Sequence, residues 1–159
     1  FQKRINELMQ TCDEAPLFQN LPGAGEILAP RLMAAFGSQR DRFESAEEIA
    51  SYCGEAPVTE RSGKQKTVKF RRGCPKFLRQ TFHEFAWSSA KHCAWARAYY
   101  RHKRSQGQGH NTAVRNLAIR WIRILYRCWK TRVAYDEAKY IAALRKRNAP
   151  CLEIGRAHV

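Results

Sequence analysis

Apolar residues recur at helical spacing over residues 111–130, and this periodicity constrains the fold more than any other feature of the sequence. Leu117, Trp121 and Leu125 lie on one side of the predicted helix, each four residues from the next. Such spacing is typical of an amphipathic helix with one side packed on a core. The chain therefore needs a hydrophobic core against which a long helix can lie.

The second half of the chain predicts an antiparallel pair of long helices. A helix-compatible stretch runs from Pro75 to about Arg104, and the Gly-containing loop 105–109 separates it from the 111–130 helix. A short connection between two helices favours antiparallel packing. A short C-terminal helix is predicted from Asp136, a good N-cap, to Arg147. The expected fold class is therefore mainly α.

The first half contains a pattern typical of a helix-hairpin-helix. A short apolar turn leads into Leu21-Pro22-Gly23-Ala24-Gly25, and a helix is predicted from there to Phe36. Glycines allow close approach of the backbone, and the N–H groups before a helix can face a phosphate. We predict phosphate contacts at Gly23, Ala24 and Gly25. An ordinary helix–helix turn with a glycine C-cap is the alternative.

Two further local patterns lie between these halves. Ser45 and Glu48 form a capping box that opens a short helix. In residues 55–73, a Ser62-Gly63 tip is followed by alternating polar and apolar side chains at Thr67-Val68-Lys69-Phe70, which predicts a small β-hairpin or extended loop.

Charge is distributed unevenly along the chain. Residues 1–60 carry 5 basic and 10 acidic side chains, whereas residues 61–132 carry 19 basic side chains and only Glu84. Such an excess repels itself unless it meets a polyanion, so nucleic acid is the favoured partner. An anionic membrane is a weaker alternative, because the arginines share helices with core aromatic residues. No apolar run approaches the roughly 18 residues that a membrane span needs.

The candidate nucleic-acid contacts are basic residues of the predicted hairpin and of one face of the 111–130 helix. Arginine is well represented among them, and its guanidinium fork matches phosphate oxygens. Besides Gly23, Ala24 and Gly25 of the helix-hairpin-helix pattern, the candidate contacts are Arg61, Lys64, Lys66, Lys69, Arg71, Arg72, Arg120, Arg123 and Arg127.

No metal site is predicted. The six cysteines form no Cys-x-x-Cys pair and fit no zinc spacing. Single thiols on helix faces are more often core residues in a reducing cytosol. The four tryptophans could stack on bases, but their helical spacing favours core packing.

Ser62 is the candidate nucleophile. A serine that attacks a phosphodiester needs exposure, nearby cations to stabilise the phosphate, and a base or metal to take its proton. Arg61, Lys64 and Lys66 are expected to supply the cations around Ser62. No local base follows until Glu84, so on these residues alone a turn serine among solvated lysines is the simpler interpretation.

The ordered set of motifs resembles one protein family. Leu21–Gly25 is followed by Tyr52-Cys53-Gly54-Glu55-Ala56-Pro57, then Arg61-Ser62-Gly63-Lys64, then Phe77-Leu78-Arg79 and Ala98-Tyr99-Tyr100. In this order the motifs resemble the C-terminal domain of the IS one-ten family of insertion-sequence transposases, the bridge-RNA-guided recombinases. Two positions depart from the pattern: Glu55 replaces a residue that is commonly apolar, and Lys64 a frequent second glycine.

The resemblance implies a role in DNA recombination. In that family an N-terminal RuvC-like domain binds Mg²⁺ through four acidic residues, and the C-terminal domain supplies a serine nucleophile, here Ser62. It implies DNA and a guide RNA as partners, a homo-oligomer, and a bacterial cytoplasmic, nucleoid-associated location without a membrane. Two rival functions remain open: a non-catalytic helix-hairpin-helix module that binds nucleic acid, and an RNA-binding structural protein.

The expected domain organisation follows from these motifs. Residues 1–14 are expected to end a linking helix, residues 15–147 to form the transposase domain, and residues 148–159 to form a tail. Residues 153–159 match a translated sequencing adapter. We expect the chain to be a fragment that lacks the metal-binding half, and therefore to bind nucleic acid without cutting it.

Overall fold

The fold is mainly α, as the sequence predicts. A computed structural model describes residues 1–69 and 71–148, so residues 149–159 of the predicted tail, with the adapter-like segment, lie outside the described residues. None of the described helices is long and apolar enough to cross a membrane. The elements are α1 (Gln2–Gln10), α2 (Ala15–Gln19), α3 (Gly25–Phe36), α4 (Ala46–Tyr52), β1 (Val58–Ser62), β2 (Gln65–Lys69), α5 (Lys76–His92), α6 (Ala94–Ser105), α7 (His110–Thr131) and α8 (Glu137–Lys146).

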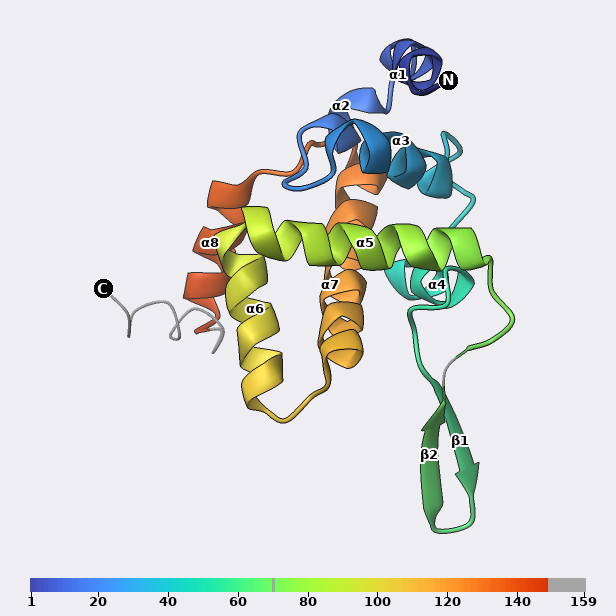
Figure 1. Ribbon diagram of the computed structural model, residues 1–159, viewed down its shortest axis with the longest axis vertical. Helices are drawn as coiled ribbons and strands as arrows, with labels where there is room; N and C mark the ends of the chain where they lie inside the picture. The colour runs from blue at the N-terminus through green and yellow to red at the C-terminus, as the bar shows by residue number, and fades with distance from the viewer. Residues whose placement is uncertain (70, 149–159) are drawn as a thin grey trace.

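The helices form a body around an aromatic core. α6 and α7 are the antiparallel pair, α5 crosses α7, and α6 begins at the C-terminal end of α5, as Figure 1 shows. Trp121 of α7 is fully buried, and its ring centroid lies 4.9 Å from that of Trp95 and 5.0 Å from that of Phe85. Its Nε1–H donates a 2.7 Å hydrogen bond to the hydroxyl of buried Ser89. The periodic apolar side of the 111–130 helix is therefore the core face.

The helix expected from Pro75 to Arg104 is broken in two at Cys93. This residue is extended (φ −130°, ψ 123°) and ends α5 one residue before α6 begins. The break turns α6 to run beside α7, which places Trp95 in the core. No Gly or Pro marks the bend, so tertiary packing rather than local preference causes it. The Cys93 thiol donates a hydrogen bond to the carboxylate of Glu137 in α8 at 3.0 Å.

Local capping signals are confirmed. The Ser45 hydroxyl accepts a hydrogen bond from the Glu48 N–H at 3.2 Å, and the Glu48 carboxylate accepts from the Glu44 N–H at 2.7 Å. Asp136 caps α8 by accepting from the Lys139 N–H at 3.1 Å. Each cap satisfies a backbone donor that a helix N-terminus leaves unpaired.

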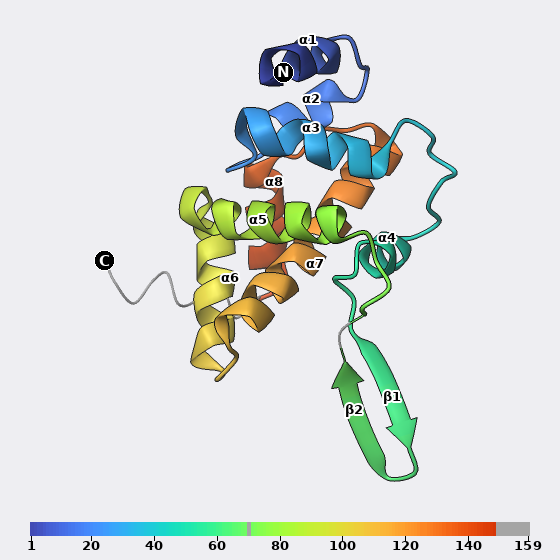
Figure 2. The same cartoon turned by 45° about the vertical axis from the view of Figure 1, so that its right-hand side comes forward.

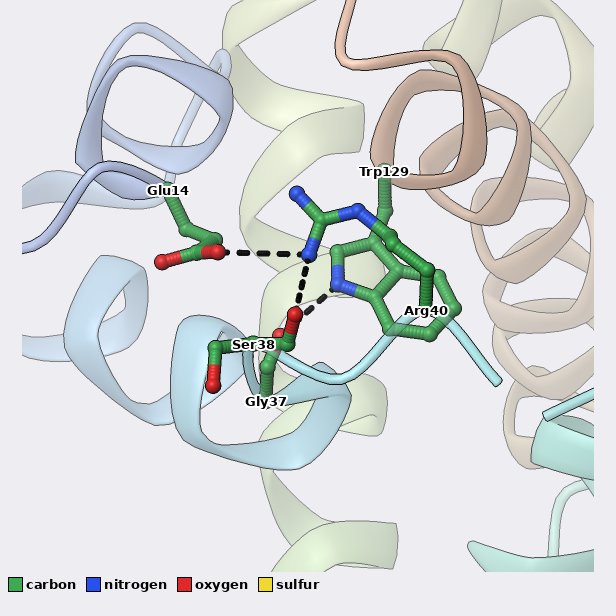
Figure 3. Close-up of polar contacts among 5 residues, drawn as sticks. All are labelled: Glu14, Gly37, Ser38, Arg40 and Trp129. Carbon is green, nitrogen blue, oxygen red and sulfur yellow. Dashed lines mark hydrogen bonds and ion pairs between the residues drawn. The ribbon is translucent and has the colours of Figure 1, made fainter. Parts of the chain in front are cut away.

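An arginine clamp joins the N-terminal helices to the end of α7 (Figure 3). Arg40 donates to the carboxylate of Glu14 at 3.2 Å and to the carbonyl of Ser38 at 2.8 Å. Its guanidinium lies 5.0 Å from the ring centroid of Trp129, whose Nε1–H donates to the Gly37 carbonyl at 2.7 Å. The Arg40 side chain is only 17% exposed, so this cation is used inside the fold.

Candidate nucleic-acid interface

The predicted hairpin forms an arm, residues 58–69, that extends away from the helical body (Figures 1 and 2). Its two strands pair in antiparallel register, with Ser62 opposite Gln65 and Val58 opposite Lys69. Apart from half-buried Val58, every residue of both strands is exposed. Side chains on both faces of the arm are therefore accessible to a large ligand.

A two-residue turn presents Ser62 near the tip of the arm. Gly63 has φ +59° at the first central position, whereas Lys64 has no positive φ. Glycine at the first position with this geometry is typical of a type II′ hairpin turn, whose twist matches that of the flanking strands. The hydroxyl-bearing residue Ser62 ends β1 immediately before this turn and is exposed.

The strand register separates Ser62 from two of the cations expected around it. Arg61 pairs directly with Lys66, and both side chains lie on the face opposite to that of Ser62, because neighbouring residues of a strand alternate between faces. The expected cluster around Ser62 is therefore split in two. The charged strand residues on the Ser62 face are Glu60 and Lys69, which form a 2.6 Å ion pair.

The root of the arm, residues 53–57 and 71–75, is packed tightly. Gly54 has φ +76°, and a side chain there would overlap the Sγ of Cys74 on the opposite leg. Arg79 of α5 donates to the carbonyl of Arg71 at 3.4 Å. Arg71, a predicted nucleic-acid contact, is thus half-buried at the root, whereas its neighbour Arg72 is exposed.

A buried carboxylate lies within this root. Glu55 is 1% exposed, and neither carboxylate oxygen receives a hydrogen bond from the described residues. The Nε of Arg115, from α7, lies 3.8 Å away. Burial raises the pKa of Glu55 to about 7, against the opposing effect of Arg115 and Arg79. Glu55 therefore changes charge near neutral pH at the junction between arm and body.

The predicted helix-hairpin-helix segment occurs as α2, a turn and α3. Gly23 (φ +82°) has no room for a Cβ, because the backbone and hydroxyl of Ser88 in α5 lie 2.8 Å from that position. The Ser88 hydroxyl donates to the Gly23 carbonyl at 2.7 Å. The close approach at Gly23 is thus to α5, and the Ala24 side chain is buried. Gly25, exposed at the start of α3, has open space at its Cβ position.

The three arginines predicted on one face of α7 have different surroundings. Arg120 is half-buried, donates to the Tyr140 hydroxyl at 2.8 Å and stacks 4.8 Å from the Tyr99 ring centroid. Arg123 is exposed and pairs with Glu47 of α4 at 3.2 Å. Arg127 is exposed. Arg120 therefore packs between Tyr99 of α6 and Tyr140 of α8. Arg123 and Arg127 point outward, as expected for this face.

Comparison with known proteins identifies the family. A family model described as the transposase IS116/IS110/IS902 family matches residues 15–101, more than half of the chain. The chain belongs to this transposase family.

Individual relatives agree with this membership. A protein of the IS117 mini-circle of Streptomyces coelicolor is 30% identical over 142 residues, covering 89% of this chain and 34% of the relative. The 42 kDa protein of insertion element IS900 from Mycobacterium paratuberculosis is 31% identical over 140 residues, covering 87% and 35% respectively. The chain thus spans about a third of the length of the curated relatives it matches.

The transposase match includes the arm, its root and α5, but not α7 or α8. Sequence reasoning noted Glu55 only as an unusual residue and did not find its burial. The one signal of burial was that the family commonly has an apolar residue at this position, whereas the surrounding Arg79 and Arg115 come from helices much later in the chain. Sequence reasoning also left out the exposed α6 residues Arg97 and Arg101, although their four-residue spacing places them on one helix face.

The described part of this transposase chain does not offer a metal site. Among residues 1–69 and 71–148, no group of three His, Cys, Asp or Glu side chains could hold a metal ion. Mg²⁺ prefers carboxylate oxygens in octahedral geometry. These residues do not fit that requirement, and no chemical step through a metal can be derived from them.

Proposed function

We propose that this chain is the part of a transposase that grips DNA and presents Ser62 as the nucleophile of strand exchange. The observation that carries the proposal is the position of Ser62: exposed, at the tip of an arm that extends from the helical body. Family membership supports a role in transposition. Because the chain spans only a third of its relatives, the activity of the whole protein is itself part of this proposal.

The proposed reaction is a transesterification. The Ser62 Oγ forms a bond to a DNA phosphorus as the bond from that phosphorus to one sugar oxygen breaks, and the departing oxygen takes up a proton. Attack by a sugar hydroxyl of a second strand reverses this step, rejoins DNA and returns the serine hydroxyl. The phosphoserine link preserves the phosphodiester bond energy between the two steps.

Other components are assigned to the complete transposase. We propose that the proton acceptor and Mg²⁺, bound by four acidic residues of a RuvC-like domain, belong to the part of the relatives' length that this chain does not span. A guide RNA and assembly into an oligomer complete the proposal. The 159-residue chain alone is then expected to bind DNA without cleaving it; Mg²⁺-dependent cleavage by this chain would contradict the division of roles.

Replacement of the nucleophile tests the catalytic role. In a complete transposase carrying this chain, Ser62→Ala should reduce recombination by on the order of 10³-fold or more, because the variant lacks the hydroxyl that is proposed to form the covalent link. DNA binding and thermal stability should not change, since the side chain is exposed. Thr67→Ala is the matched control, because Thr67 is an exposed hydroxyl on the same face of the arm.

The outcome separates the proposal from its main alternative. If the Ser62→Ala variant recombines DNA at the full rate, the chain is better explained as a non-catalytic module that binds nucleic acid. Binding itself has a separate signature. If several basic side chains contact phosphates, raising the salt concentration from 50 to 200 mM should lower the DNA affinity by on the order of 10³-fold. An affinity independent of salt would contradict both functions.

A further inference from the structure

The two faces of the arm carry different charge arrangements. On the Ser62 face, Glu60 and Lys69 neutralise each other across the strands at 2.6 Å. On the other face, Arg61 and Lys66 are a directly opposed pair of like charges. Like charges directly opposite one another destabilise a sheet. Among the described residues, neither Arg61 nor Lys66 takes part in an ion pair with a carboxylate. This pair of cations is therefore suited to an external anion.

The location of the serine relative to this pair determines what kind of nucleic acid fits. Ser62, if it attacks a phosphate as proposed above, meets one sugar–phosphate backbone on its own face of the arm. Arg61 and Lys66 point to the opposite side, away from that backbone. A second backbone on that side would supply the missing anion.

We propose that the arm lies edge-on in the major groove of duplex DNA, with the Arg61–Lys66 pair on the phosphates of one strand and Ser62 facing the other strand. This inference rests on the proposed role of Ser62 and adds the form of the substrate. The serine is then directed to one strand by cations that hold the complementary strand.

The dimensions of the arm agree with this placement. Each strand has five residues, a length of about 17 Å at roughly 3.3 Å per residue. The thickness of a sheet with its side chains is about 10 Å. The major groove of B-form DNA is about 12 Å wide and about 8.5 Å deep and admits a two-stranded ribbon. In both views the arm projects away from the helices, so the body does not surround its tip (Figures 1 and 2).

Other nucleic acids fit these two faces less well. A single strand has one backbone and can contact the Ser62 face or the Arg61–Lys66 face, but not both in a fixed geometry. An RNA duplex has a deep, narrow major groove that side chains do not enter. Duplex DNA is therefore the one occupant to which the arrangement of charges and the shape of the arm both point.

Affinity measurements on the 159-residue chain test the inference. Arg61→Gln combined with Lys66→Gln removes the pair, and Arg145→Gln combined with Lys146→Gln is the matched control, removing one exposed arginine and one exposed lysine at the end of α8. Fluorescence anisotropy is measured for both variants with a DNA duplex, one of its single strands, and an RNA duplex of the same sequence, over a range of salt concentrations.

The expected result is selective for duplex DNA. The arm variant should bind the DNA duplex about 10-fold or more weakly, with the slope of log K against log salt reduced by about 1 to 2. Its affinity for the single strand and the RNA duplex should change no more than that of the control variant. Amide exchange within the arm should not become faster, because the substitution removes a repulsion rather than a stabilising contact.

Three results would overturn the inference, and they separate it from the proposed function. Equal losses for the DNA duplex and the single strand would show a general electrostatic contact while leaving the nucleophile role intact. A loss confined to the RNA duplex would assign the arm to RNA. Absence of salt-dependent DNA binding by the unsubstituted chain would overturn the proposed function and this inference together.

Discussion

The helical body and the arm differ in how they use their side chains. The body buries large aromatic residues completely, among them Trp95, Trp121 and Trp129, whereas almost the whole of the arm is exposed. Burial of apolar area is the main favourable contribution to folding. The free energy of folding therefore comes from the body, and the arm contributes accessible functional groups at little cost to the core.

The root explains how an arm with so little core keeps its position. An isolated two-stranded hairpin is marginally stable in water. Here both legs are fixed to helices: the Glu55 N–H donates to the Ala50 carbonyl of α4 at 2.9 Å, and Arg79 of α5 donates to the Arg71 carbonyl. Stability and the proposed function are thus separated in space, and the root is the region where they meet. Substitutions in the body, the root and the arm can test this division.

The largest effect is expected in the body. Trp121→Ala should lower the free energy of unfolding by about 3–5 kcal/mol, because it leaves a cavity beside Trp95 and removes the hydrogen bond to Ser89. Urea denaturation followed by circular dichroism measures this loss. Val68→Ala in the arm, where the side chain is 60% exposed, should change the same quantity by less than about 0.5 kcal/mol. Similar losses for both variants would contradict the comparison.

An intermediate, pH-dependent effect is expected at the root. Because the pKa of folded Glu55 is raised from its ordinary 4.5 to about 7, the folded state binds this proton more tightly than the unfolded state. Its contribution to stability is therefore present at low pH and is lost as pH rises through 7. Relative to the unsubstituted chain, Glu55→Gln should gain stability between pH 5 and pH 8, by about 1–3 kcal/mol in total.

A control for the Glu55 prediction must account for the other charged and titratable groups near this carboxyl. Arg115 and Arg79 face it from α7 and α5, and both lower its pKa against the effect of burial. The pKa of His83, on α5, is lowered by burial and by Arg115, so its own contribution has the opposite dependence on pH. Unfolding at several pH values is therefore compared between Glu55→Gln, His83→Gln and the unsubstituted chain. A pH profile unchanged by Glu55→Gln would show that this carboxyl does not titrate as the geometry indicates.

The smallest effect on global stability is expected at the tip of the arm. Gly63 has φ +59°, where an alanine costs about 1 kcal/mol in the left-handed region, and no neighbouring atom would clash with it. Gly63→Ala should therefore speed amide hydrogen exchange in β1 and β2 several-fold while exchange in α7 stays the same. Faster exchange throughout the helices would show that arm and body unfold as one unit.

Sequence reasoning worked best where the signal is local. The core face of α7, the capping residues Ser45 and Asp136, and the hairpin around Ser62 all follow from short patterns, and the structure confirms them. The bend at Cys93 was missed because it depends on packing of Trp95 rather than on a breaking residue.

The candidate site shows the same limit. Its residues could be named from charge and motif, but their division between two faces depends on the register of β1 and β2, which places Arg61 opposite Lys66. Closeness in the sequence alone predicts one cluster of these cations around Ser62. Pairing of the two strands separates them, and burial of Glu55 depends on helices that follow later in the sequence.

The exposure of the arm has a practical consequence for handling the protein. Trypsin cleaves after lysine and arginine in accessible, extended backbone, and the arm offers Arg61, Lys64, Lys66 and Lys69 within nine residues. Most lysine and arginine residues of the helical body lie in hydrogen-bonded helices. Limited proteolysis should therefore nick the molecule first in this segment, and slower nicking would report directly that a ligand has covered it.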